Sequence, residues 1–308
     1  MTVYAQNYGL GRLGRRLKIT GLDIDMCDTL TKLFSTADIA AAMGVGESSV
    51  KRWIDAGTLG AEKTPGGHRR VTLTDFYNFL RATGKKLVAP EAVGLPGLVE
   101  VEGKSPFEVC QASLQIGDAF TFESALQLLR LSEPNPAAAL DKTVYPAFKA
   151  VRAICHHPSE ECLVLHRAIA VAQAALKITM APLSETVPLE SPRVVFADIG
   201  YDVDGLPTLF AEAAVWDQAQ CLQLGTSVPA TVIEGALDAF NASVLWLSAS
   251  GPARRSAINA DFQSILTRAS HRHTKVVVFG DAVPRVLPVP VTRVTSFGEF
   301  RGFVAALA

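Results

Sequence analysis

The chain has 308 residues, of which 49% are hydrophobic and 19% charged, and this balance excludes a disordered chain and predicts two or three folded domains. The net charge is only −1, but it is unevenly distributed. Residues 1–87 hold 13 Lys and Arg against 8 Asp and Glu, whereas the remainder holds 16 against 22. A basic first part followed by an acidic second part is expected when only the first part meets a polyanion.

The cysteines and the apolar runs indicate a cytoplasmic protein that does not enter a membrane. The five cysteines are odd in number and have no C-x-x-C pairs, which predicts reduced thiols; they are Cys27, Cys110, Cys155, Cys162 and Cys221. No signal peptide and no apolar run of membrane-spanning length is found in the sequence. Residues 1–32 lack apolar periodicity, so we expect an N-terminal arm, and Met26 offers a second start for translation.

The stretch 34–81 predicts a helix-turn-helix followed by a hairpin and a third helix. Ser35 and Asp38 have the spacing of a capping box at the start of the first helix, and Gly44 has the place of its left-handed end. In the second helix, which ends at Gly57, the residues at i, i+3 and i+4 are apolar and form its core face. The opposite face is polar and carries Ser48, Ser49, Lys51 and Arg52.

This polar face has the chemistry of a recognition helix in the DNA major groove. Arg52 can pair with the edge of a guanine through two hydrogen bonds, and Lys51 can pair with a phosphate. Such a face on an isolated pair of helices is also typical of a solvated surface. The features that follow along the chain decide between the two interpretations.

A hairpin is predicted over 59–71, because Pro65, Gly66 and Gly67 together favour a tight turn. The residues of this turn that we expect to contact DNA are Thr64, His68, Arg69 and Arg70. Positive charge on a rigid hairpin suits contact with the DNA backbone or the minor groove. We call this basic hairpin the wing. The ordered combination of two helices, the wing and a capped third helix predicts binding of double-stranded DNA.

The segments VKRWIDAGTL and TPGGHRR resemble the MerR and excisionase-type winged helix-turn-helix family. This resemblance covers the head only, for which we expect the bounds 33–87. It implies a bacterial regulator of transcription that binds DNA rather than RNA.

After the head, Gly and Pro residues over 88–105 predict a linker. The apolar spacing over 106–182 predicts a bundle of four helices. We expect these helices near 106–116, 121–131, 137–155 and 159–181.

From 193 to 308, short β-rich runs alternate with helical runs. This order predicts an α/β flavodoxin-like fold, that is, a doubly wound parallel sheet with right-handed crossovers. The expected strands are 194–199, 221–225, 244–250, 275–280 and 289–294. Ligands of such sheets bind at the carboxyl ends of the strands. The whole chain is therefore predicted to be multidomain: a winged helix-turn-helix head, a four-helix bundle and an α/β sheet.

This order of domains resembles the light-responsive, cobalamin-dependent MerR-type repressors. The segment LQLGTSVPATVIEGALDAFNASVLWLSAS is similar to that family at Gly225, Pro229, Ser248 and Ser250. The resemblance implies an effector pocket between the bundle and the strand ends. The candidate effector-pocket positions are Cys155, His166, Asp204, Gly225, Ser248, Ser250 and Gly280.

Three departures from the family's pattern argue against cobalamin as the cofactor. Asp204 stands where the family has the histidine that binds cobalt, and a carboxylate is a poor substitute for imidazole. In the bundle, Cys155 replaces a tryptophan and Leu165 replaces a glutamate, while His166 is kept. Asp281 replaces the second glycine of a pair that admits the nucleotide tail. We therefore expect no histidine-ligated cobalamin, and no cofactor in its place.

The cysteines and histidines near the third bundle helix leave an alternative open, namely a haem or a metal ion; they are Cys155, His156, His157, Cys162 and His166. Their spacing fits no structural zinc signature. Packing at a helix start is the favoured interpretation, and no metal site is expected.

Three hypotheses on function follow. The first is a transcription regulator whose body, that is, the helical bundle and the α/β sheet, senses a small-molecule effector or a protein partner. The second is a methyltransferase or mutase module, which the missing cobalt ligand and the DNA-binding head argue against, so no enzyme activity is expected. The third is a DNA-binding protein whose body is only a dimerisation or partner-recruiting scaffold. A homodimer or tetramer is expected in either regulatory case.

Overall fold

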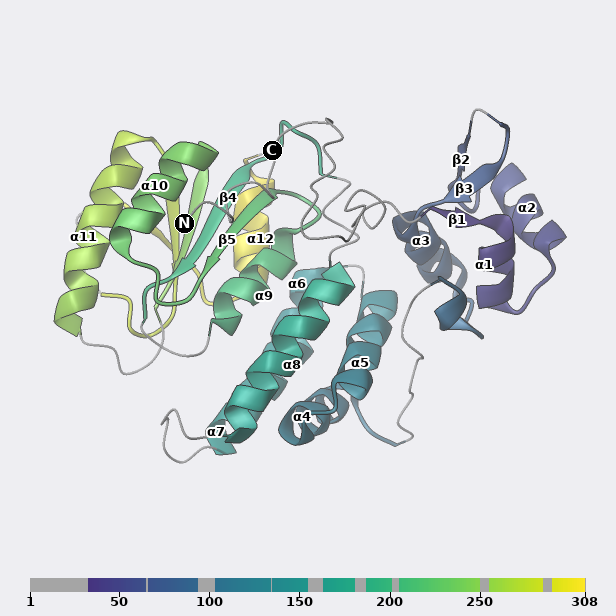
Figure 1. The fold of residues 1–308 in the computed structure, drawn as a ribbon, viewed down its shortest axis with the longest axis horizontal. Coiled ribbons are helices and arrows are strands. Elements are labelled where there is room, and N and C mark those ends of the chain that lie inside the picture. Colours follow the sequence, from purple (N-terminus) through teal and green to yellow (C-terminus); the bar gives the residue numbers. More distant parts are fainter. Residues whose placement is uncertain are drawn as a thin grey trace, which may run out of the picture.

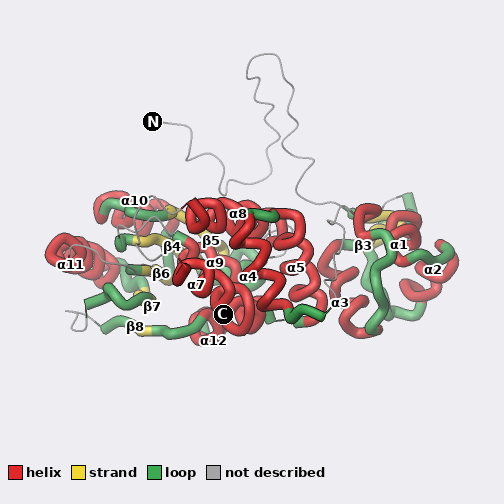
Figure 2. The backbone as a smooth tube through the Cα atoms, turned by 90° about the horizontal axis from the view of Figure 1, so that it is seen from below, coloured by secondary structure: helices red, strands yellow, loops and turns green. Residues whose placement is uncertain are grey.

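The computed structural model has a head, a helical bundle and an α/β part, which follow one another along the chain (Figure 1). It describes residues 33–64, 66–93, 103–133, 135–154, 163–180, 187–200, 205–249, 255–284 and 290–307. The expected N-terminal arm, 1–32, lies outside these residues. The head and the α/β part lie at opposite ends of the molecule with the bundle between them (Figure 2). This arrangement confirms the predicted fold class.

The head folds around the helix-turn-helix that the sequence predicts. Its elements are β1 (Phe34–Ser35), α1 (Thr36–Met43), α2 (Glu47–Asp55), β2 (Glu62–Lys63), β3 (Arg69–Val71), α3 (Leu73–Thr83) and the 3₁₀-helix η1 (Pro90–Val93). The strands form an antiparallel sheet in the order β1-β3-β2. At the start of α1, the amide of Ser35 donates to the Asp38 carboxylate at 2.8 Å, and the amide of Asp38 donates back to Ser35 Oγ at 3.2 Å. Gly44 ends α1 with a φ of 63°, a left-handed conformation that favours glycine.

The head extends beyond the expected boundary at residue 87. The amides of Val88 and Ala89 both donate to the carbonyl oxygen of Ala42, at 2.8 and 3.1 Å. Val93 is 2% exposed and belongs to the apolar core of the head. Residues 88–93 therefore complete the head instead of starting the linker, because they cover the end of α1.

The bundle has the expected helices, one of them interrupted. Its elements are α4 (Pro106–Ile116), α5 (Ala119–Ser132), α6 (Pro136–Ala139), the π-helix η2 (Leu140–Val144), α7 (Tyr145–Ile154) and α8 (Leu163–Met180). The single helix expected over 137–155 is thus α6, η2 and α7 in succession. A π-helical turn inserts an extra residue into a helix, and hydrophobic spacing alone does not reveal it.

The α/β part is a five-stranded sheet in which every described strand pair is parallel. Its elements are β4 (Arg193–Asp198), α9 (Leu206–Val215), β5 (Gln220–Gly225), α10 (Ala230–Phe240), β6 (Val244–Ser248), α11 (Arg255–His271), β7 (Lys275–Phe279), β8 (Thr292–Arg293) and α12 (Phe297–Ala305). The strand order is β5-β4-β6-β7-β8. This is the flavodoxin-like order, in which the second strand pairs outside the first.

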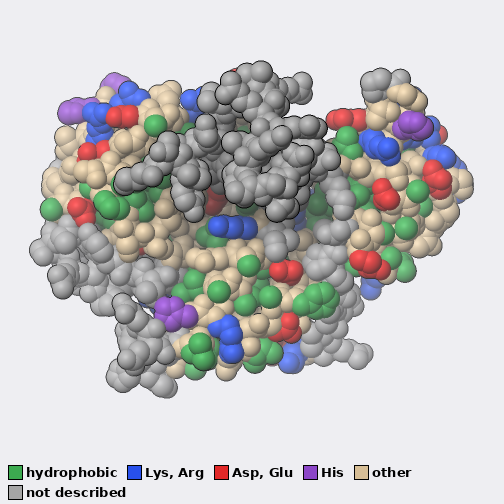
Figure 3. Space-filling model, viewed as in Figure 1, with side chains coloured by type: hydrophobic (Ala, Val, Ile, Leu, Met, Phe, Trp, Pro, Cys, Tyr) green, Lys and Arg blue, Asp and Glu red, His purple; other side chains and the backbone are tan. Residues whose placement is uncertain are grey.

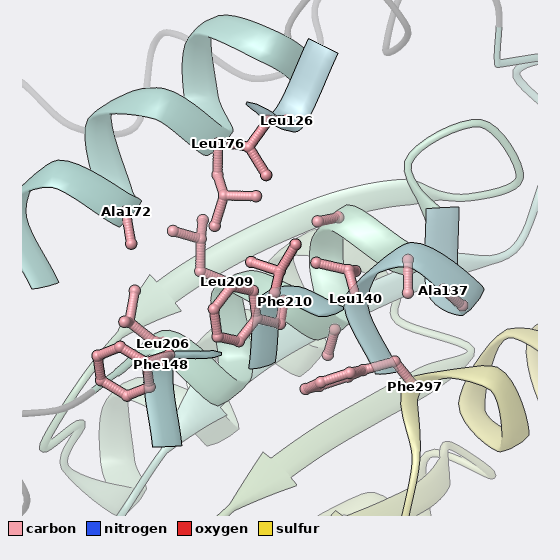
Figure 4. Packing of buried hydrophobic residues seen from close by; sticks show 14 of the residues in the cluster. Leu126, Ala137, Leu140, Phe148, Ala172, Leu176, Leu206, Leu209, Phe210 and Phe297 are labelled. Carbon is pink, nitrogen blue, oxygen red and sulfur yellow. The ribbon is translucent and has the colours of Figure 1, made fainter. Parts of the chain in front are cut away.

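Alternate residues of the central strands face two separate cores, as the two-residue period of a strand requires. Val195 and Leu245 face the core that α10 and α11 cover. Phe196 and Trp246 face the other core, to which α9, α12 and the bundle contribute. Figure 4 shows this second core, where Phe148 of α7 lies close to Leu206 of α9. Bundle and sheet therefore share one continuous core.

Asp141 of η2 joins the bundle to the last helix. Its carboxylate accepts the amide of Phe297 at 2.9 Å and the amide of Gly298 at 2.8 Å. These amides open α12, where the helix dipole favours negative charge. The contact fixes α12 against the bundle.

Candidate DNA interface and strand-end site

Helix α2 is held in the head by one face and exposes the other. Val50 is fully buried, and the ring of Trp53 lies 4.8 Å from the ring of Phe79 on α3, centroid to centroid. The opposite face leaves the predicted contact residues Ser48, Lys51 and Arg52 exposed and Ser49 partly exposed. A helix fixed by a buried valine and a partly buried tryptophan, and exposed along its polar side, has the geometry to enter a groove.

The charged residues of α2 differ in how far they are already neutralised. Lys51 Nζ lies 3.0 Å from Glu47 Oε1, one turn earlier on the same helix. The hydroxyl of Thr36 donates to the same carboxylate at 2.6 Å; this bond and the neighbouring Lys51 lower the pKa of Glu47. Arg52 donates to Ser49 Oγ at 3.2 Å, and no acidic partner of Arg52 is found in the described part of the chain. An exposed pair such as Lys51–Glu47 contributes little and can exchange for a phosphate.

The wing is shaped by two of the residues predicted to contact DNA. The amide of Thr64 donates to the carbonyl of His68 at 2.9 Å, and the amide of His68 donates to Thr64 Oγ1 at 3.1 Å. Gly67 has a φ of 77°, which the tight turn requires. Thr64 therefore closes the turn with its hydroxyl, whereas His68 is exposed at the tip.

Arg69 and Arg70 lie on β3 and are each partly buried. Arg69 forms an ion pair with Asp55, at the end of α2, so it links the wing to the candidate recognition helix. Asp55 could not be recognised from the sequence, because its partner is 14 residues away along the chain. Figure 3 shows lysine and arginine side chains and a histidine on the outer part of the head, with acidic side chains among them. The structure thus places all the predicted contact residues on α2 and the adjoining wing.

At the other end of the molecule, three candidate effector-pocket residues share the carboxyl edge of the sheet. Gly225 ends β5 and pairs with Ala197, Ser248 ends β6 and pairs with Phe279, and Gly280 follows Phe279 directly. Gly225 and Gly280 have positive φ values of 92° and 108°, so the chain turns sharply there. Cys155, Asp204 and Ser250 lie outside the described residues, as does most of the cysteine and histidine cluster.

Asp198 also lies at this edge of the sheet, and it was not among the predicted residues. Its carboxylate accepts the hydroxyl of the buried Ser248 and, at 2.9 Å, the amide of Gly200. Asp198 is itself fully buried at the end of β4. A charged residue that closes the apolar run VVFAD was the signal in the sequence that could have identified it.

Among the described residues at this edge of the sheet, no histidine is placed to bind cobalt. The described polar side chains there include those of Asp198, Ser248 and Thr226, and residues 199–208 contain no histidine in the sequence. The loops after β4 and β5 pack closely together at Gly205 and Thr226. If Gly205 were replaced by a residue with a side chain, its Cβ atom would lie only 2.1 Å from Cγ2 of Thr226. Carboxylate and hydroxyl oxygens are hard ligands, unlike the imidazole that the resemblance requires.

Two further observations concern metals and membranes. Among the described residues, no group of three His, Cys, Asp or Glu side chains is arranged to hold a metal ion. His166 lies on α8, and its Nε2 is buried without a hydrogen-bond partner in the same described set. No described helix has both the length and the apolar character to cross a membrane.

Comparison with known proteins identifies the head. Residues 33–83 match the family described as a helix-turn-helix domain, the class of domain that binds duplex DNA through its second helix. The head is therefore a DNA-binding helix-turn-helix domain. Among curated proteins, none matches this chain.

Solved structures that resemble this chain have low sequence identity. The monomethylamine corrinoid protein of Methanosarcina barkeri is 12% identical, with a TM-score of 0.48 over 66% of this chain and 98% of that one. A cobalamin-binding protein of Desulfitobacterium hafniense DCB-2 is 14% identical, with a TM-score of 0.31 over 66% and 98%. The methanol:cobalamin methyltransferase complex of Methanosarcina barkeri is 13% identical, with a TM-score of 0.33 over 73% and 87%. All three scores lie below 0.5, and the assignment of the fold rests on the strand order of the sheet.

Proposed function

We propose that this protein is a sequence-specific regulator of transcription of the MerR-like type. The observation that carries the proposal is the fixed orientation of α2. Val50 and Trp53 hold one face of the helix in the core, and the opposite face presents Arg52 without an acidic partner among the described residues. The basic wing lies beside it, linked through the Arg69–Asp55 ion pair. Base contacts from the helix and backbone contacts from the wing are the usual division of roles.

We further propose that the body controls the head instead of catalysing a reaction. Bundle and sheet share one core, so a change at either can reach α5, which packs against α3 of the head. The rival interpretation, in which the body only dimerises the protein or recruits a partner, requires no ligand. The two differ in whether a small molecule alters the affinity for DNA.

The DNA-binding role can be tested with the full-length protein and a pool of random duplexes, from which the bound duplexes are selected and sequenced. We expect one enriched sequence and an affinity that falls steeply as salt rises, because bound phosphates release counterions. The R52A variant is expected to lose the enrichment, whereas R272A, which changes an exposed arginine at the end of α11, is expected to keep it. Binding without sequence enrichment and without salt dependence would contradict the proposal.

A further inference from the structure

A cavity of about 280 Å³ lies where the head meets the body. Its wall comes from α3 of the head, from α5, α6, η2 and α8 of the bundle, and from the turn after α9. Part of the wall is apolar and includes Leu126, Leu140 and Leu176, which Figure 4 shows from close by. Two arginines, Arg81 of α3 and Arg130 of α5, also border it.

The guanidinium group of Arg130 is held in place but only partly satisfied. It lies 4.3 Å from the ring centroid of Tyr77, and its Nη1 donates to the carbonyl of Thr179 at the end of α8. Its Nη2 is buried and has no hydrogen-bond partner in the described structure. The cation–π contact and the hydrogen bond restrain the guanidinium, and the N–H groups of an arginine suit a planar acceptor.

Arg81 adds a second positive charge at the same cavity. Its Nε is also buried without a partner among the described residues. Burial lowers the pKa of Arg130 and the positive charge of Arg81 lowers it further, whereas Tyr77 and Asp217 raise it. A buried guanidinium N–H group without a partner is costly, and an anion that accepts from it removes that cost.

The acidic residues at the cavity form their hydrogen bonds with groups other than Arg81 and Arg130. Both oxygens of Asp217 accept hydrogen bonds from Arg301 of α12, at 2.6 and 2.9 Å. Glu133 Oε1 accepts the amide of Asn135 at 3.0 Å. The cavity therefore has two guanidinium groups that each keep a buried N–H group without a partner among the described residues, next to an apolar wall.

We propose that this cavity binds a small organic anion, with its carboxylate held by Arg81 and Arg130 and its apolar body against Leu126, Leu140 and Leu176. Arginine pairs with a carboxylate through two parallel hydrogen bonds, and the apolar wall favours an organic acid over inorganic phosphate. Because Arg81 belongs to the head and the other four to the bundle, an occupant bridges both. The regulatory consequence rests on the proposed function: the bound acid acts as an effector that sets the affinity for DNA.

Binding is measured first on the full-length protein without DNA, by thermal shift and calorimetry. The probes are benzoate, phenylacetate and octanoate, each compared with its neutral primary amide, and inorganic phosphate. We expect at least one acid to bind about tenfold or more tightly than its amide, and more tightly than phosphate. If no acid binds better than its amide, or if phosphate binds as tightly as the best acid, the proposal is wrong.

Binding to variants then tests whether the acid occupies this cavity. R130Q and, independently, R81Q should each lose most of the affinity for the best acid, whereas R272Q should keep it. Arg272 is a matched control because it pairs with Asp238 far from the cavity. If R130Q fails to fold, the affinity of R81Q for the acid still tests the site. Unchanged affinity in a folded R81Q or R130Q would overturn the assignment of the site.

The last measurement is the affinity for a selected duplex with and without the best acid. A change of about fivefold or more that disappears in R81Q supports the effector role. An acid that binds without changing the affinity for DNA overturns the effector role but not the site. A protein that binds the acid but no duplex at all overturns the proposed function instead, so the two failures are distinguishable.

Discussion

The phenolic hydroxyl of Tyr77, on α3 of the head, donates a hydrogen bond to the side-chain oxygen of Gln127, on α5 of the bundle. Both residues are buried, with exposed fractions of 0% and 3%. Burial raises the pKa of Tyr77, so the neutral phenol that donates this bond persists to high pH. This bond joins the DNA-binding head to the body through the protein interior.

The Y77F variant should therefore destabilise the protein. Removal of the hydroxyl leaves the oxygen of Gln127 buried without a partner, which costs about 1–3 kcal/mol of the free energy of unfolding. Urea denaturation of the full-length protein measures the loss. The double variant Y77F/Q127M removes both polar groups at similar volume and should recover most of it. Equal stability of Y77F and wild type would show that the bond contributes nothing.

Arg52 and Arg69 should differ in their effect on DNA binding. R52A should reduce the preference for the selected sequence by about 1–3 kcal/mol, if Arg52 pairs with a base edge. R69A should weaken binding to every duplex alike, because a wing contact with phosphate carries no sequence information. Fluorescence anisotropy with a selected and a scrambled duplex separates the two effects.

Asp55 supplies the matched control for the wing. D55N breaks the ion pair with Arg69 but keeps the positive charge on the wing. If Arg69 contacts phosphate, D55N should bind DNA as tightly as wild type. If Arg69 only anchors the wing to α2, D55N should weaken binding as much as R69A does.

Glu212 should make the protein less stable as the pH rises above the acidic range. This residue of α9 accepts a hydrogen bond from Gln223 Nε2 of β5 at 3.1 Å, and burial raises its pKa above the ordinary 4.5 despite that bond. The folded protein therefore holds the proton more tightly than the unfolded chain does. The resulting stability is fully present below pH 4.5 and is lost as the pH rises through the higher folded pKa.

The E212Q variant keeps a group that can bond to Gln223 but removes the titration. Its free energy of unfolding should exceed that of wild type at pH 7, and the difference should vanish near pH 4. Denaturant titrations across this range measure both curves. E62Q, at an exposed position of the wing, controls for the change in net charge. Parallel curves for wild type and E212Q would show that Glu212 titrates normally.

Local patterns predicted most of the elements but few of the contacts between them. The apolar run at β4 and the caps at Ser35 and Thr72 depend on residues close in sequence, so they can be recognised directly. The carboxylate of Asp141 caps a helix that begins 156 residues later, and no local pattern contains that information. The bond from Ser248 to Asp198 likewise appears only when parallel strands bring their ends together. Sequence alone therefore located the candidate DNA-binding face but missed the cavity between head and bundle.

The full-length protein is expected to be a homodimer or a tetramer. A single head covers one half-site, and regulators of this kind gain affinity by placing two heads on repeated half-sites. Light scattering after gel filtration, with and without a selected duplex, gives the mass. A monomeric mass in both conditions would contradict this prediction and would favour one head per operator.

The protein is also expected not to bind cobalamin through a histidine on cobalt. Asp204 has the place of the ligating histidine in the sequence, and the described groups at the strand ends include the carboxylate of Asp198 and the hydroxyl of Ser248. Asp281 follows β7 where the resembling family has a glycine, and its charge repels a nucleotide phosphate. Incubation with adenosylcobalamin or hydroxocobalamin, followed by gel filtration read by visible absorbance, measures binding. We expect no co-elution with wild type.

The D204H and D281G variants separate the two obstacles to cobalamin. If only the missing ligand prevents binding, D204H alone should co-elute with cobalamin and show the absorbance of imidazole-ligated cobalt. If the charge at Asp281 also excludes the nucleotide, binding should require both substitutions together. Stoichiometric co-elution of the wild-type chain with the same imidazole-ligated spectrum would contradict the prediction, because a histidine outside 199–208 would then have to reach the metal.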